Sequence, residues 1–216
     1  MMADETDAPG KLAVLHGLAT SSASWRVRIA LNLKGVAYRQ QRCDLRAGEQ
    51  RGAAFLALNP QGLVPALEID GLVLTQSLAI CEYLDETRPG PPLLGASPAE
   101  RARIRALAQV IACDTHPLQN LKVKQALRAS CLGEEGALAW AQRFTGEGLA
   151  AFAALAERLP GPFAAGARPS LADICLIPHL GNARRDHVEI AWPRLREIED
   201  ACAALPAFAA ARPENQ

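Results

Sequence analysis

The chain has 216 residues, with 23 acidic and 23 basic side chains and a formal net charge of zero. Because a nucleic acid or an anionic membrane surface attracts an excess of positive charge, this balance supports neither kind of partner. Half of the residues are hydrophobic, so the chain can form a real core, in one large domain or in two small ones that share an interface. No apolar run approaches the length needed to span a bilayer.

The first ten residues, MMADETDAPG, are acidic and lack the apolar segment of a secretory signal, so we expect a disordered leader over 1–10. Six cysteines occur without a CxxC motif, and four histidines occur without the spacing of metal ligands. Together these features predict a reduced, cytoplasmic protein with no metal site.

A hydroxyl cluster stands between the first predicted strand, at Leu12–Leu15, and a helix that runs to Lys34 before Gly35. Its members are Thr20, Ser21, Ser22 and Ser24. The unpaired N–H groups and the dipole of a first helical turn favour an anion, and the hydroxyls add donors at the same place. For any single serine the alternative is ordinary capping of the helix.

The elements expected over residues 11–87 follow the order βαβαββα, a thioredoxin-like pattern without the CxxC motif. Asp70-Gly71 is a strong signal for a tight hairpin between the last two strands. After the first strand and helix, these elements are a strand at Val36–Cys43, a helix at Gln50–Leu58, strands at Ala66–Ile69 and Leu72–Leu74, and a helix capped by Ser77 that ends near Glu86.

Helical signals alone follow the Pro- and Gly-rich stretch that begins at Arg88, which predicts a linker over 88–97 and an all-α domain over 98–216. Pro117 should kink or stop the first of these helices, and Gly146 and Gly148 should bend a long one. The expected helices cover Pro98–Ala112, Glu134–Leu159, a segment that opens with a capping-box variant at Ser170–Asp173, Pro193–Ala204 and Ala207–Ala211.

Two further motifs in the first half suit the binding of a small peptide. Pro65, directly ahead of a strand, would present the backbone of Val64 to an extended peptide if the Val64–Pro65 bond is cis. The alternative is a rigid loop proline. Gln76-Ser77 combines an amide donor with a hydroxyl at a helix start, where a carboxylate is favoured, and the alternative is a plain N-cap.

These motifs together with the hydroxyl cluster describe a site for a small peptide thiol. The thiolate is the nucleophilic form of a thiol, and hydroxyl donors at a helix N-terminus lower the thiol pKa by hydrogen bonding to that charged form.

The segment SSASWRVRIALNLKGVAY resembles the zeta-class glutathione transferases, which include the maleylacetoacetate and maleylpyruvate isomerases. That resemblance implies the glutathione transferase fold, with a thioredoxin-like glutathione-binding domain at 11–87 and a helical substrate domain at 98–216, and it implies a homodimer. The family's Arg-Ser-Ser-Cys-Ser-Trp-Arg segment carries arginine where this chain has Thr20 and cysteine where it has Ala23.

The resemblance also assigns site residues. It implies that Ser22, with Ser21 and Ser24 beside it, supports the thiolate, and that Thr20 stands where the family has a carboxylate contact. Two segments of the second half, HPLQN and NARR, also match the family. The residues expected to hold glutathione are Val64, Pro65, Gln76, Ser77 and Gln119, and Arg185 is expected to face the carboxylate of the substrate.

The resulting prediction is a glutathione-dependent cis–trans isomerase of a maleyl-type oxo acid, which acts by reversible addition of the thiolate. Two alternatives stay open at this point. One is another glutathione transferase activity on an electrophile, such as conjugation, peroxide reduction or dehalogenation. The other is a protein of this fold that binds a ligand without turnover.

Overall fold

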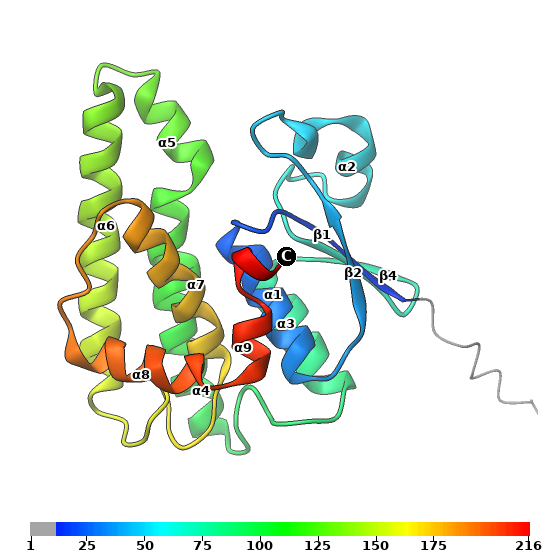
Figure 1. Ribbon diagram of the computed structural model, residues 1–216, viewed down its shortest axis with the longest axis vertical. Coiled ribbons are helices and arrows are strands. Elements are labelled where there is room, and N and C mark those ends of the chain that lie inside the picture. Colours follow the sequence, from blue (N-terminus) through cyan, green and yellow to red (C-terminus); the bar gives the residue numbers. More distant parts are fainter. Residues whose placement is uncertain (1–11) are drawn as a thin grey trace, which may run out of the picture.

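The computed structural model describes residues 12–216, so the leader expected over 1–10 lies outside the described residues. The first half contains a four-stranded sheet with helices, in the predicted order (Figure 1). Its elements are β1 (Ala13–Gly17), α1 (Ser22–Leu33), β2 (Tyr38–Arg42), η1 (Glu49–Arg51), α2 (Ala53–Leu58), β3 (Ala66–Ile69), β4 (Leu72–Thr75) and α3 (Ser77–Thr87).

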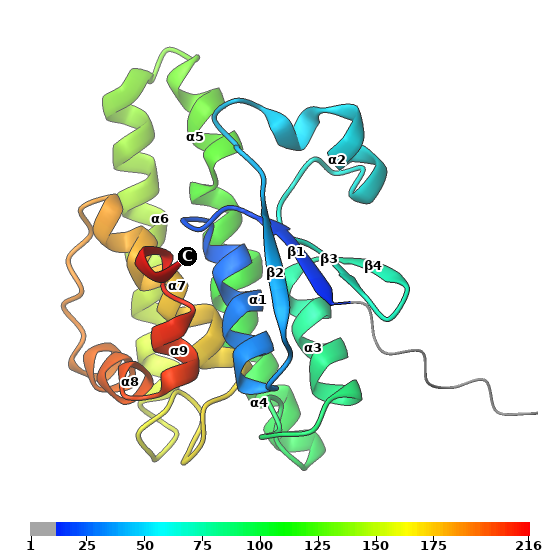
Figure 2. The ribbon, with the colours of Figure 1, turned by 45° about the vertical axis from the view of Figure 1, so that its right-hand side comes forward.

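The sheet has the strand order β2-β1-β3-β4, in which β1 and β2 are parallel and the other pairs are antiparallel. The β3–β4 hairpin turns at Asp70 and Gly71, whose φ angles of 52° and 74° confirm the tight turn that the Asp-Gly pair predicted. Helices α1 and α3 lie between the sheet and the second half of the chain (Figures 1 and 2). This is a thioredoxin-like arrangement, and it brings the starts of both helices to the junction of the two halves.

The second half is helical throughout, as predicted. The π-helical turn η2 and the 3-10 turn η3, which contains Pro117, follow α4, and Asn120 caps a helix, α5, that the sequence pattern did not indicate. The elements are α4 (Pro98–Gln109), η2 (Val110–Thr115), η3 (His116–Gln119), α5 (Leu121–Arg128), α6 (Gly133–Ala156), α7 (Leu171–Arg185), α8 (Pro193–Ala203), α9 (Pro206–Ala210) and η4 (Pro213–Asn215).

One hydrophobic core joins the two halves. It contains Leu15 of β1 and Ile29 of α1 together with Phe152 of α6 and Leu176 of α7, all fully buried. Because apolar burial is the main favourable term in folding, this shared core holds the two halves in a fixed relation. Side chains that come from both halves can therefore form one site.

Two local expectations were wrong. Gln76, not Ser77, is the N-cap of α3, and Ser77 is the first helical residue. Helix α6 continues without a break through Gly146 and Gly148. A Cβ atom at position 148 would lie 2.0 Å from Oγ1 of Thr115, so Gly148 lets another helical segment pack closely and does not bend the helix.

The capping box at the start of α7 is confirmed. The carboxylate of Asp173 accepts hydrogen bonds from the backbone N–H and the hydroxyl of Ser170, each at 2.8 Å. Over the part of the chain that the structure describes, no helix is long and apolar enough to cross a membrane.

Candidate glutathione and substrate site

Helix α1 begins at the junction of the two halves, and its first turn is partly capped. Oγ of Ser21 accepts a hydrogen bond from the backbone N–H of Ser24 at 3.3 Å. The N–H groups of Ser22 and Ala23 have no acceptor among the described residues. The helix dipole and these two donors make this start a place for negative charge.

The hydroxyl of Ser22 is buried under this turn and is held from the second half. Its oxygen accepts from Nδ2 of Asn182 on α7 at 3.0 Å and lies 3.1 Å from Nε2 of His116 in η3. Only 3% of the Ser22 surface is exposed. Both halves of the chain therefore fix the position of the hydroxyl.

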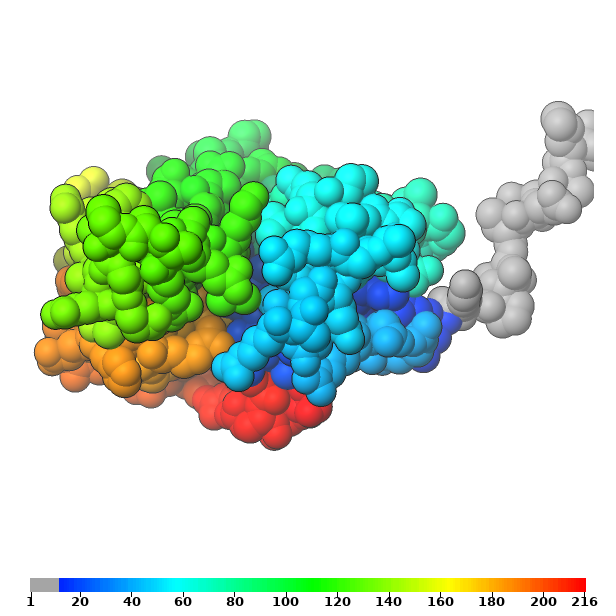
Figure 3. Space-filling view, turned by 90° about the horizontal axis from the view of Figure 1, so that it is seen from above, coloured from blue at the N-terminus to red at the C-terminus, as the bar shows by residue number. Residues whose placement is uncertain are grey.

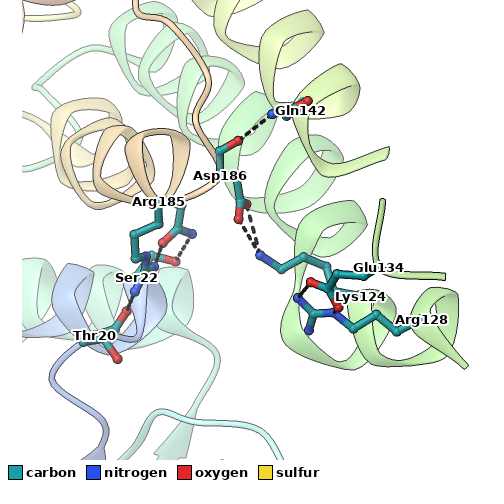
Figure 4. A network of polar contacts seen from close by, with 9 residues as sticks. Thr20, Ser22, Lys124, Arg128, Glu134, Gln142, Arg185 and Asp186 are labelled. Atoms are coloured by element: carbon teal, nitrogen blue, oxygen red, sulfur yellow. Dashed lines mark hydrogen bonds and ion pairs between the residues drawn. The ribbon is translucent and has the colours of Figure 1, made fainter. Parts of the chain in front are cut away.

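Arg185, at the end of α7, lies over the loop that precedes α1. Its Nη1 donates to the backbone oxygen of Thr20 at 2.9 Å, and its Nη2 donates to Oδ1 of Asn182 (Figure 4). The side chain stays exposed, as does Thr20. A guanidinium has five donors, so Arg185 keeps donors for a carboxylate ligand while it makes these bonds.

The loop ahead of β3 carries a cis peptide bond between Val64 and Pro65, the geometry on which the proposed presentation of the Val64 backbone depends. Asn59 fixes this loop, because its Nδ2 donates to the backbone oxygen of Leu63 at 2.6 Å. The backbone N–H and C=O of Val64 have no partner within residues 12–216. An extended peptide can pair with both groups.

Helix α3 begins without a side-chain cap. Gln76 takes the N-cap position with a φ of 67°, and its Nε2 donates to Oε1 of Gln61 at 2.8 Å. The backbone N–H groups of Ser77, Leu78 and Ala79 have no acceptor in the described chain. A carboxylate bound here would satisfy donors that the helix leaves open.

Gln119 and Ser24, which the sequence also assigned to the site, are both buried but differ in whether they can reach a ligand. Gln119 is buried, and its Nε2 has no hydrogen-bond partner in the structure as described, so it can donate to a ligand. Ser24 is fully buried against β1, where a Cβ atom at Gly17 would lie 2.6 Å from its Oγ. The structure therefore does not group the Ser24 hydroxyl with that of Ser22.

Sequence reasoning did not assign three residues of this site: His116, Asn182 and Arg26. The first two fix the Ser22 hydroxyl, and they stand in the family-like segments HPLQN and NARR, which was the available signal. Arg26 is 2% exposed, and its Nη1 donates to Oγ of Ser77 at 3.3 Å. Nothing in the helical periodicity shows that an arginine is buried there.

Two neutral histidines lie behind the start of α1, with ring centroids 6.5 Å apart. Burial, followed by the positive charge of Arg26, holds the pKa of His116 well below its ordinary value. The same two causes lower the pKa of His179 to about 3. His179 is fully buried, and neither of its ring nitrogens has a partner among the described residues.

The site contains no arrangement typical of a metal centre. No group of three or more His, Cys, Asp or Glu side chains that could hold a metal ion occurs within the described residues. All six cysteines are free, and four of them are buried. The groups that the structure brings to this site are helix starts, a hydroxyl, amides and a guanidinium.

The fold and this site define a class of protein: a thioredoxin-like domain joined to a helical domain, with open peptide- and anion-binding groups at their junction. Comparison with known proteins gives the family. The glutathione S-transferase N-terminal domain family matches residues 20–87, and the corresponding C-terminal domain family matches residues 139–210.

A relative from Rhizobium meliloti strain 1021, maleylacetoacetate isomerase, is 50% identical over 99% of each chain. The solved structure of a maleylpyruvate isomerase, described as a bacterial glutathione S-transferase of the zeta class, has a TM-score of 0.90 at 40% identity and covers 94% of this chain and 98% of its own. A maleylacetoacetate isomerase structure from Methylobacterium extorquens AM1, with bound malonate and glutathione, has a TM-score of 0.90 at 44% identity over 94% and 97% of the two chains. The chain belongs to the glutathione S-transferase family, in the zeta class that these isomerases represent.

Proposed function

We propose that the protein is a glutathione-dependent cis–trans isomerase of a maleyl-type oxo acid, such as maleylacetoacetate or maleylpyruvate. The observation that carries this proposal is the buried Ser22 hydroxyl at the start of α1, which Asn182 connects to Arg185. A group that stabilises a thiolate and a group that binds a carboxylate are thus connected through one side chain. The names of the relatives support the same activity.

The groups left open at the junction suit glutathione. The unpaired backbone of Val64, which precedes Pro65, suits the cysteinyl backbone, and the open first turn of α3 at Gln76-Ser77 suits the γ-glutamyl carboxylate. The buried Nε2 of Gln119 is a further donor with no protein partner in the described chain. When bound, glutathione supplies the thiolate nucleophile for reversible addition to the double bond of the substrate.

Ser22 is the residue that we propose as the hydroxyl donor to the sulfur. His116 is neutral, and we assign its proton to Nε2, the tautomer in which it donates to the Ser22 oxygen as Asn182 does. With both lone pairs of the oxygen occupied, the Ser22 proton is free to point toward the ligand. Hydrogen bonding to the charged form lowers the pKa of a thiol, so Ser22 and the N–H groups of α1 favour the thiolate. Ser21 already serves as the cap of α1, although none of the described residues accepts its own proton.

Arg185 is the residue that we propose for one carboxylate of the substrate. Arg185→Ala should raise KM for a maleyl-type acid by about tenfold or more, because a charge-assisted hydrogen bond is lost, and it should leave glutathione affinity nearly unchanged. Steady-state kinetics and calorimetric titration of glutathione measure the two effects separately. An effect on glutathione alone would contradict the assignment.

The isomerase activity itself is tested with purified protein, catalytic glutathione and maleylacetoacetate or maleylpyruvate. We expect conversion to the fumaryl product that depends on glutathione. Retention on glutathione resin with no isomerisation, together with turnover of an electrophilic aryl chloride, would select a conjugating transferase instead.

We also propose that the protein works as a homodimer in the cytoplasm. Edge strand β4 exposes Leu72 and Val73 at 46% and 47%, and an exposed apolar edge is a surface that a second copy can cover. The free cysteines suit a reducing compartment. Light scattering should give the mass of two chains, and the mass of one chain would contradict the dimer.

A further inference from the structure

Lys124 of α5 points toward the end of α7, close to the proposed substrate site (Figure 4). Its Nζ lies 2.8 Å and 3.1 Å from the two carboxylate oxygens of Asp186. The side chains are 17% and 10% exposed, so both groups are largely removed from solvent. The backbone oxygen of Asp186 accepts from Nε2 of Gln142 at 3.0 Å, which fixes the residue that holds the ammonium.

Lys124 and Arg185 meet at the end of α7, because Lys124 binds Asp186, the residue that follows Arg185. Arg185 contacts Asn182, which donates to Oγ of Ser22. Burial and Arg26 are the main causes that lower the pKa of His116, whose Nε2 lies 3.1 Å from the same oxygen, and the positive charges of Arg185 and Lys124 add to them. Seen from above, green residues of the helical half and cyan residues of the first half lie on either side of a small blue area of the first half (Figure 3).

The substrate class proposed above needs two cationic contacts, because a maleyl-type oxo acid carries two carboxylates. Arg185 supplies one contact. Thr20, whose backbone oxygen accepts from Arg185, has an uncharged side chain and does not supply the second. The structure from Methylobacterium extorquens AM1 holds malonate, itself a dicarboxylate, together with glutathione. An ammonium group has three N–H donors, so Lys124 can bind Asp186 and still donate to a ligand.

We infer that Lys124 is a specificity-determining residue that binds the second carboxylate of a dicarboxylic substrate. The inference rests on the proposed function. Asp186 orients the ammonium and balances its charge while the site is free of substrate. An exposed lysine would lose this orientation, since its long side chain has many rotamers.

The test uses the full-length protein, with malonate as the probe in the presence of saturating glutathione. Lys124→Met should weaken malonate binding by about tenfold or more in calorimetry, because it removes a charge-assisted hydrogen bond. It should raise KM for the maleyl substrate by a similar factor with little change in kcat. Lys124→Arg should restore most of the affinity.

Two matched variants separate this role from a structural one. Arg128→Met removes another cation of α5 together with its ion pair to Glu134, and it should leave malonate affinity unchanged. Asp186→Asn removes the negative charge of the ion pair but keeps the cation, and its amide oxygen can still accept a hydrogen bond that orients the ammonium. If Lys124 binds the ligand, Asp186→Asn retains malonate affinity within a few-fold. If the pair only anchors α5 to α7, both variants lose affinity alike.

The inference is overturned if Lys124→Met binds malonate as tightly as the wild type, or if Asp186→Asn loses as much affinity as Lys124→Met. If Lys124→Met does not fold, Lys124→Gln replaces it. Its malonate affinity is then compared with that of Asp186→Asn in the same way. Failure of the proposed function has a different signature: the wild type would bind glutathione and malonate without isomerising a maleyl acid.

Discussion

Helices α1 and α3 both begin at the proposed glutathione site and both have serine as their first residue, yet their first turns are completed differently. Ser21 caps α1, and Ser22 is bound by side chains of the helical half. The N-cap of α3 is Gln76, whose side chain makes no capping bond. Ser77 accepts from Arg26 instead of bonding to its own helix.

This difference matters for the ligand that each helix start can hold. Helix α3 leaves its first three N–H groups open within the described chain, which suits a carboxylate that needs several donors. Helix α1 leaves two N–H groups without an acceptor in residues 12–216 and adds one buried hydroxyl of fixed position, which suits a single sulfur atom. The α3 start should therefore govern affinity, and the α1 start should govern chemistry.

The largest effect expected from this comparison is that of Ser22→Ala. The variant should lower kcat for isomerisation by about a hundredfold or more, as the loss of one preorganised donor to a developing charge does elsewhere. Glutathione affinity should change much less. Pre-steady-state kinetics and calorimetry on the same preparation measure both. A variant with normal kcat and weak glutathione binding would reverse the roles of the two helix starts.

Acid should weaken the region behind α1, because two neutral histidines lie there. His179 has an ordinary pKa of about 6.5 when unfolded and a pKa of about 3 when folded. Its folded-state pKa is depressed, so its contribution to stability is present above about pH 6.5 and is lost as pH falls below that value. By pH 4.5 the loss should reach about 2–3 kcal/mol from His179 alone.

His179→Met tests this pH dependence, since neither ring nitrogen of His179 has a partner among the described residues to lose. Urea unfolding at pH 7 and pH 4.5 should show a smaller loss of stability in the variant than in the wild type. Equal losses in the two proteins would mean that His179 is protonated in the folded state at pH 4.5.

Ser77→Ala should have the next largest effect, this time on affinity. Removal of one charge-assisted hydrogen bond to the γ-glutamyl carboxylate should weaken glutathione binding by about 1–3 kcal/mol. The value of kcat at saturating glutathione should stay within a few-fold of the wild type. Calorimetric titration measures the change, and an unaltered dissociation constant would exclude Ser77 from the glutathione site.

Ser21→Ala should have the smallest effect and should act mainly on stability. Ser21 caps α1, and loss of a serine N-cap costs about 1 kcal/mol of folding free energy. Denaturant unfolding measures this loss. If Ser21→Ala instead lowers kcat as strongly as Ser22→Ala is expected to do, then Ser21 carries the hydroxyl that meets the sulfur.

The sequence predicted local features well, because each depends on neighbouring residues. The Asp70-Gly71 turn and the capping box at Ser170 are both present, and the bond before Pro65, whose geometry the sequence left open, is cis. The clustering of Ser21 and Ser22 at the α1 start follows from the same kind of local signal. Roles drawn from the family resemblance, such as those of Gln119 and Arg185, stay predictions until they are measured.

Features set by distant partners could not be read from the sequence. The hydroxyl of Ser22 is held by Asn182, 160 residues away, and Arg28 is buried because it donates to the backbone oxygens of Ala19 and Ala211. Gly148 leaves room for Thr115 to pack against α6, whereas its sequence context indicated only that the helix would bend there. The contacts of Ser22 with Asn182 and of Arg28 with Ala211 exist only once the two halves share one core, and that of Gly148 with Thr115 exists only once α6 packs against η2.

The most direct measurement of the central claim is the ionisation of glutathione bound to the full-length protein, followed by the ultraviolet absorbance of the thiolate against pH. The account predicts an apparent pKa clearly below the value of about 8.5 that an ordinary thiol has. It also predicts a return toward that value in Ser22→Ala but not in Ser77→Ala. A bound thiol that titrates like the free one in the wild type would contradict the account.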